Sequence, residues 1–193
     1  MSAIRIIVGL ANPGKAYAAT RHNAGAWFVE DLIKQTACTP LKFETKFHGY
    51  HTTFLSQNTR CHLLIPTTFM NESGKAVRAL MHYCKLSAEN LLVAHDDIDL
   101  PVGTIKLKFD GGDGGHNGLK DVIKHIHTKA FHRLRIGVGR PRQTRDVIDY
   151  VLHAPSKVDR QKIDTALTAA YDILPLLISG ETQKAMQQLH TSD

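Results

Sequence analysis

A short apolar run that ends at a chain-breaking turn constrains the fold more than any other feature of this sequence. Residues 4–10 (IRIIVGL) are mostly β-branched and aliphatic, which is typical of a buried strand. Residues 12–14 (Asn-Pro-Gly) then end that strand, because proline removes a ladder donor and glycine permits positive φ. Polar capping residues at 20–23 precede a helical pattern that continues to about Thr36. The N-terminal segment therefore predicts a strand–loop–helix unit of an α/β fold.

The rest of the chain repeats strand and helix patterns without a long linker or an internal repeat. We therefore expect one α/β domain over residues 1–193, with Pro175 kinking the long C-terminal helix or ending it early. The predicted strands are 41–43, 49–55, 61–66, 91–94, 104–109 and 132–138, with a hairpin turn at 56–58. The predicted helices begin near residues 71, 119, 156 and 182.

His22 lies where the first predicted strand gives way to the helix, flanked by Arg21 and Asn23. In open α/β sheets, ligands bind at the rim formed by the carboxyl ends of the strands. Asn71 and Asp96 also follow predicted strands, so we expect all three side chains at that rim. The alternative for His22 and for Asn71 is helix capping alone. Position makes His22 a candidate for catalysis.

Positive charge is concentrated in one part of the chain. The whole sequence has a net charge of +6, yet residues 101–145 hold ten Lys or Arg and three Asp, so the remainder is close to neutral. Such a cluster favours a polyanionic partner, with nucleic acid the first choice and a solvated basic face the alternative. Two pairs share one face of a predicted strand: Lys106 with Lys108, and Arg133 with Arg135.

A glycine-rich segment, residues 110–118 (DGGDGGHNG), precedes the predicted helix at 119–126. Five glycines predict a mobile loop or a backbone that approaches a ligand closely. The segment lacks the Lys-Ser/Thr ending of a P-loop and the later acid of a dinucleotide fingerprint. His116 and Asn117 fall at the helix N-terminus, where backbone amides and the helix dipole suit a partly negative oxygen.

Composition and spacing exclude several other classes. The sequence has no run of about 18 apolar residues and no secretory N-terminus, so we expect a cytoplasmic protein. Its three cysteines are widely spaced, which indicates buried thiols and neither a disulfide framework nor a zinc site. The close histidine pairs, 48/51 and 125/127, lack the acids of a metallohydrolase motif, and no G-x-S-x-G is present.

Five motifs taken together resemble the bacterial-type peptidyl-tRNA hydrolases. In order they are NPG at 12, YAATRHNAGAWFVED from Tyr17, PTTFMNESGKAV from Pro66, VAHDDIDLP from Val93 and GGHNGLKDV from Gly114. The resemblance covers nearly the whole chain. It implies a mixed, largely parallel twisted sheet flanked by helices. It also implies a monomer that hydrolyses the ester between a peptide and the 3′ end of tRNA, recycling tRNA from stalled translation without cofactor or metal.

The resemblance also implies roles for individual residues. His22 would be the general base that activates water, and Asp96 would hold its imidazole. An ester is an activated acyl group, so water, one base and preorganised amide donors suffice. The other implied roles are peptide and water binding by Asn12, Asn71 and Asn117, cleft lining by Tyr17 and Phe69, and phosphate clamping by Lys108 and Arg135 beside Lys106 and Arg133.

Two features of the sequence differ from the family pattern, and one alternative function competes with the assignment. Asp110 and Asp113 place negative charge in the glycine-rich loop, where it would weaken RNA binding, and Pro175 interrupts the C-terminal lid. The rival is a non-catalytic RNA-binding protein on the same scaffold. Such a protein would keep the basic cluster and lose the base, so the joint presence of His22, Asp96 and the three asparagines argues against it.

Overall fold

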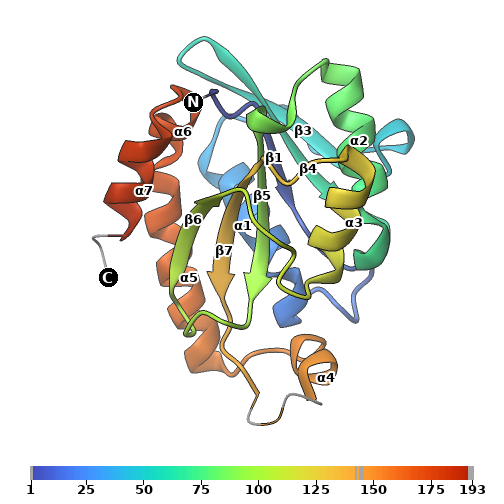
Figure 1. Ribbon diagram of the computed structural model, residues 1–193, viewed down its shortest axis with the longest axis vertical. Helices are drawn as coiled ribbons and strands as arrows, with labels where there is room; N and C mark the ends of the chain where they lie inside the picture. The colour runs from blue at the N-terminus through green and yellow to red at the C-terminus, as the bar shows by residue number, and fades with distance from the viewer. Residues whose placement is uncertain (1, 142, 144–145, 191–193) are drawn as a thin grey trace.

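Seven strands form a single sheet in the computed structural model, which describes residues 2–141, 143 and 146–190. They are β1 (Ile6–Gly9), β2 (Lys42–Glu44), β3 (Gly49–Ser56), β4 (Thr59–Pro66), β5 (Leu91–Asp97), β6 (Ile105–Phe109) and β7 (His132–Gly137). Along the sheet the order is β2-β3-β4-β1-β5-β7-β6 (Figure 1). The four central strands run parallel, whereas β2, β3 and β6 pair antiparallel with their neighbours. The predicted mixed α/β sheet is confirmed, with parallel pairing confined to its centre.

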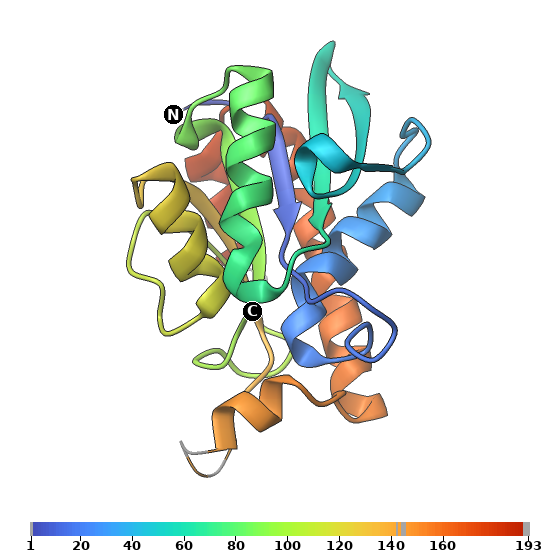
Figure 2. The ribbon, with the colours of Figure 1, turned by 90° about the vertical axis from the view of Figure 1, so that its right-hand side faces the viewer.

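Helices cover both faces of this sheet. They are α1 (Ala24–Gln35), α2 (Ser73–Cys84), α3 (Asn117–Ile126), α4 (Val147–Val151), α5 (Lys157–Asp172), α6 (Leu174–Ile178) and α7 (Thr182–His190). One apolar core packs beneath α1 and α5–α7, and a second packs beneath α2 and α3 (Figure 2). Because side chains alternate across a strand, β1 serves both cores, with Ile7 in the first and Ile6 in the second. The short helix α4 lies beyond the carboxyl ends of the central strands (Figure 1).

Most predicted element boundaries match the structure. The hairpin turn between β3 and β4 has Gln57 and Asn58 at positive φ, which matches the right-handed twist of the strands. The long C-terminal helix ends at Asp172, and α6 begins anew with Pro175 in its first turn, where a missing N–H costs nothing. Arg142 and Arg145 of the basic segment lie outside the described residues. Within the described part of the chain, no helix is long and apolar enough to span a membrane.

Close packing at Gly25 brings the candidate residues together. A Cβ atom at this position would lie 2.2 Å from the Ala94 carbonyl oxygen and 2.7 Å from the Leu10 nitrogen. Only glycine therefore lets the start of α1 press against the carboxyl ends of β1 and β5. The single 3₁₀ turn before α1, η1 (Arg21–Asn23), is held beside the end of β5 as a result. This contact places His22 next to Asp96.

Candidate active site

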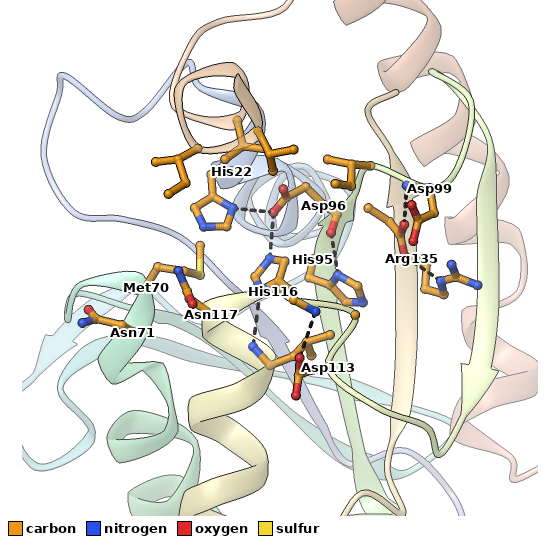
Figure 3. A pocket seen from close by; sticks show the side chains of 18 of the residues that line it. His22, Met70, Asn71, His95, Asp96, Asp99, Asp113, His116, Asn117 and Arg135 are labelled. Atoms are coloured by element: carbon orange, nitrogen blue, oxygen red, sulfur yellow. Dashed lines mark hydrogen bonds and ion pairs between the residues drawn. The ribbon is translucent and has the colours of Figure 1, made fainter. Parts of the chain in front are cut away.

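A cleft of about 560 Å³ opens at the carboxyl ends of the central strands. Its walls come from the loop after β1, from η1, from η3 (Met70–Glu72), from the end of β5, from the glycine-rich segment and from α4 (Figure 3). This is the rim at which the sequence predicted a ligand site. The loops that line it follow strands β1, β4 and β5, which are neighbours in the sheet although far apart in sequence.

His22 and Asp96 form a buried pair at the base of this cleft. The Nδ1 atom of His22 lies 2.9 Å from Oδ1 of Asp96, and the two residues are 8% and 3% exposed. Burial lowers the pKa of His22, but the charge and hydrogen bond of the Asp96 carboxylate outweigh burial and raise that pKa above 6.5. Nδ1 therefore carries the proton that Asp96 accepts, and Nε2 remains available to the cleft.

His116 supports Asp96 from the opposite side. Its Nε2 atom lies 2.9 Å from the same Oδ1 atom, and its Nδ1 accepts from the backbone nitrogens of Gly118 and Leu119 at 3.1 and 3.3 Å. The hydrogen-bond pattern assigns His116 to the neutral tautomer with its proton on Nε2. Burial raises the pKa of Asp96, but the two flanking histidines outweigh it and lower that pKa well below its ordinary value.

The role of His116 was not predicted, although the sequence placed this residue at the start of the helix. The available signal was its position: a histidine immediately before a helical pattern can cap the helix with one ring nitrogen and reach the rim with the other. In the structure His116 is the N-cap of α3. Asn117, which was predicted at the helix start, is the first helical residue.

Ligating atoms of His22, Asp96 and His116 lie within 4.8 Å of one another, a spacing that could hold a metal ion. A cation here would have to displace the proton that lies between His22 and Asp96 and the proton that lies between His116 and Asp96. It would also move the His116 proton to Nδ1, where it would abolish the cap on α3. The donor and acceptor pattern therefore suits a hydrogen-bonded cluster better than a metal site.

Asn12 is fixed so that its amide group faces the cleft. Its Oδ1 atom accepts from the backbone nitrogen of Met70 at 2.8 Å, which leaves the Nδ2 hydrogens free to act as donors. Asn23 holds the backbone of Asn12 through two hydrogen bonds of 2.8 and 2.9 Å. The predicted capping role of residue 23 is thus wrong, because its side chain ties the Asn-Pro-Gly turn to η1 and makes no cap to α1.

Asn71 and Asn117 also line the cleft (Figure 3). Both are exposed, and neither side chain has a hydrogen-bond partner within the described residues. Neither residue serves as a side-chain cap, so the structure leaves both amides free for a ligand. The three predicted asparagines are therefore gathered around one cavity.

The two predicted aromatic residues have different outcomes. Phe69 lines the cleft and is 55% exposed, as predicted. Tyr17 is not among the residues that line this cleft, and its part in the substrate site stays a prediction. Its backbone closes the turn after β1, with its nitrogen donating to Gly14 and its carbonyl accepting from Thr20. Met70, which was not predicted, lines the cleft between Asn12 and Asn71.

The predicted basic residues divide into three groups. Lys108 and Arg135 line the cleft, and Nε of Arg135 donates to Asp97 at 2.7 Å. Arg133 also lines the cleft, but it is buried, and its guanidinium donates to the carbonyl oxygens of Gly111 and Gly112. Its predicted contact with phosphate is replaced by anchoring of the loop, and burial lowers its pKa. Lys106 does not line the cleft, but pairs in register with Arg135 across β6 and β7.

The two acidic residues of the glycine-rich loop shape its turns. Asp110 has φ of 62°, and its carboxylate accepts from the nitrogen of Gly111 at 2.6 Å. The carboxylate of Asp113 accepts from the nitrogen of Gly115 at 2.8 Å. Both charges are therefore engaged with backbone amides of the loop itself, which reduces the repulsion of RNA expected from the sequence.

An apolar wall faces the histidine cluster. It consists of Val147, Ile148 and Val151 of α4 and of Leu152, the C-cap of that helix, at a spacing that could have predicted this helix. The guanidinium of Arg21 holds α4 in place. It donates to the carbonyl oxygens of residues 150, 153 and 154, and it lies 4.0 Å from the centroid of the Tyr150 ring.

Together the fold and the site define a hydrolytic centre on an α/β fold, in which a histidine oriented by a buried carboxylate faces a cleft lined with amide donors. The family model for peptidyl-tRNA hydrolase matches residues 6–193. A curated peptidyl-tRNA hydrolase of Nitrosospira multiformis is 48% identical over 188 residues, which cover 97% of this chain and 98% of that protein. This chain belongs to the peptidyl-tRNA hydrolase family.

Solved structures agree with that assignment. The crystal structure of peptidyl-tRNA hydrolase from Acinetobacter baumannii superposes with a TM-score of 0.94 at 43% identity, covering 98% of this chain and 95% of that one. A complex of peptidyl-tRNA hydrolase with N-propanol gives a TM-score of 0.93 at 42% identity, covering 96% and 94% of the two chains. The predicted α/β fold and family are confirmed.

Proposed function

We propose that this protein hydrolyses the ester bond between a peptide and the 3′ end of tRNA, with His22 as the general base. The observation that carries the assignment of the base is the pairing of His22 Nδ1 with the buried carboxylate of Asp96. That hydrogen bond leaves Nε2 as a proton acceptor in a cleft that is lined by three asparagines. Family membership supports the reaction itself, and the non-catalytic alternative has no support.

The reaction follows from the positions of these groups. Nε2 of His22 takes a proton from a water molecule as its oxygen attacks the ester carbonyl carbon. Asp96 stabilises the imidazolium that forms, and the Nδ2 hydrogens of Asn12 are available to the developing oxyanion. The C–O bond to the ribose then breaks, and the imidazolium returns its proton to the departing ribose oxygen. The carboxylic acid formed on the peptide loses its proton to solvent, so the products are the peptide carboxylate and tRNA with a free 3′-hydroxyl.

The two sides of the cleft suit the two parts of this substrate. The asparagines and Phe69 offer amide and apolar contacts to a peptide, while Lys108 and Arg135 offer positive charge to phosphates at the acceptor end of tRNA. We assign the activity to a monomer, since a single chain supplies the base, its carboxylate partner, the amides and the cations of the cleft. We place it in the cytoplasm, since the three cysteines are free thiols.

The experiment that tests the function measures release of N-acetylated amino acid from acetyl-aminoacyl-tRNA, with and without EDTA. We expect multiple turnover at rates unchanged by the chelator. Binding of the tRNA without release of the acyl group would favour the RNA-binding alternative. Loss of activity in EDTA with recovery on adding a divalent ion would contradict the metal-free mechanism.

Lys108 provides a separate test of the tRNA contact. Its ammonium group is exposed beside the cleft, and within the described residues it has no acidic partner that its removal would strand. Changing Lys108 to Ala should raise KM with little change in kcat, and should reduce the slope of log(kcat/KM) against log[salt] by about 0.7–1. Lys120→Ala, an exposed lysine on α3, is the matched control. An unchanged salt slope would remove Lys108 from the tRNA contact.

A further inference from the structure

His95 is a buried histidine of the cleft to which the proposed reaction gives no role. It is 3% exposed, lies next to Asp96 on β5, and lines the same cavity. Its Nδ1 atom donates to the backbone carbonyl of Asp96 at 2.6 Å, so the proton of the neutral ring is on Nδ1. Burial and the nearby His116 lower the pKa of His95 to about 3, which keeps the ring neutral. Its Nε2 atom is therefore a hydrogen-bond acceptor.

This acceptor has no partner within the described residues. Its ring packs edge-on against that of His116, with centroids 5.1 Å apart, so His116 closes one side of it. Figure 3 shows the ring between His116 and Arg135, on the basic side of the cleft. Buried polar atoms in folded proteins are almost always hydrogen-bonded, so this buried acceptor calls for a donor that the described residues do not supply.

Neighbouring atoms define the chemistry of that ligand. On β7, Arg135 pairs in register with His95, and Arg133 lies two residues earlier on the same face of the sheet. The Nε atom of Arg133 is also buried and has no partner in the described part of the chain, so this wall presents one unpaired acceptor and one unpaired donor beside cationic groups. A neutral group with both a donor and an acceptor, attached to a phosphodiester chain, meets this pattern. A nucleoside fits it better than a peptide, because the three asparagines lie on the other side.

We propose that Nε2 of His95 accepts a hydrogen bond from the 3′-terminal nucleoside of the tRNA, which makes His95 a specificity-determining residue for the reaction. The donor is either the ribose 2′-hydroxyl or the exocyclic amine of the terminal adenine. This inference rests on the proposed function, because it requires the substrate to be an ester of that nucleoside.

The loop over this wall makes few side-chain contacts. Residues 112–115 line this part of the cleft, and a Cβ atom at Gly112, Gly114 or Gly115 would meet no atom within 4 Å. The loop is held inward mainly by Arg133, through the carbonyl oxygens of Gly111 and Gly112. Outward movement of the loop would break these two hydrogen bonds and little side-chain packing, and it would admit the nucleoside.

Two substitutions at residue 95 distinguish the role of the Nδ1 donor from the role of the Nε2 acceptor. In His95→Asn the amide can still donate to the Asp96 carbonyl, as Nδ1 does, but nothing replaces the acceptor at Nε2. In His95→Gln the longer side chain places an amide oxygen near the Nε2 position and loses the Nδ1 donor. His95→Asn therefore removes the proposed contact with the nucleoside and keeps the hydrogen bond to the Asp96 carbonyl. His95→Gln keeps the proposed contact and loses that hydrogen bond.

The experiment compares three acetyl-aminoacyl-tRNAs, ending in adenosine, 2′-deoxyadenosine or purine riboside, which lacks the exocyclic amine. We expect the wild type to prefer adenosine in kcat/KM by about 3- to 10-fold over the analogue that lacks the contacting donor. That preference should fall to near one in His95→Asn and persist in His95→Gln. The analogue that is discriminated against identifies the hydroxyl or the amine as the donor.

Two results would overturn the inference: equal use of all three substrates by the wild type, or an unchanged preference in His95→Asn. A uniform loss of activity on all three substrates in His95→Asn, with the preference retained, would assign His95 to structure alone. Failure of the wild type to hydrolyse the adenosine substrate is a different result, because it would contradict the proposed function itself.

Discussion

Changing His22 to Ala should reduce kcat for peptidyl-tRNA hydrolysis by about 10²- to 10⁴-fold, the range typical for loss of a general base. The alanine removes the ring that Asp96 orients through Nδ1 and whose Nε2 is the proposed proton acceptor in the cleft. Substrate affinity should change little, because the tRNA contacts lie on the basic side of the cleft and the peptide contacts are amides. Single-turnover release of acetyl-amino acid and tRNA binding by filter retention would measure the two quantities separately.

A matched control is available for this substitution. His82 is an exposed histidine on α2, outside the cleft, so His82→Ala should leave kcat and KM near those of the wild type. Loss of fold is checked by thermal unfolding of both variants, since His22 is buried. Retention of more than about a tenth of wild-type kcat in folded His22→Ala would refute the base assignment.

The sequence predicted the rim of the sheet more completely than it predicted the hydrogen bonds within it. His22, Asn71 and Asp96 each follow a strand, and strands with buried apolar runs are detectable by pattern alone, so their convergence was predictable. Spacing places His116 at the helix N-terminus, where one ring nitrogen can cap the helix, but it does not identify Asp96 as the partner of the other nitrogen. It likewise does not identify Asn23 as the side chain that holds the backbone of Asn12.

The basic residues illustrate the same limit in another form. Strand alternation correctly placed Arg133 and Arg135 on one face, but it could not say which of the two would be buried. In the structure Arg133 holds the glycine-rich loop and Arg135 pairs with Asp97. Only Lys108 is left as an exposed cation beside the cleft with no acidic partner within the described residues. Charge counted along the sequence therefore overstates the charge available to a ligand.

Changing Asp96 to Asn should lower kcat by a factor on the order of 10²–10⁴, the second largest effect expected here. The amide carries no charge to stabilise the His22 imidazolium. If its NH₂ group faces Nδ1, the proton moves to Nε2 and the base is lost. The same oxygen accepts from His116 in the wild type, so the substitution also weakens the support of that ring. Steady-state kinetics at neutral pH measures the loss.

The pH profile separates this explanation from a general disturbance of the cleft. A general base works in its neutral form, so kcat/KM should fall as the pH drops through the pKa of His22, which lies above 6.5 in the wild type. Without the carboxylate, the remaining influence of burial lowers that pKa, and the acid limb of Asp96→Asn should move below pH 6.5. An acid limb at the same pH in both proteins would mean that Asp96 does not set the protonation of His22, and a structural role would then suffice.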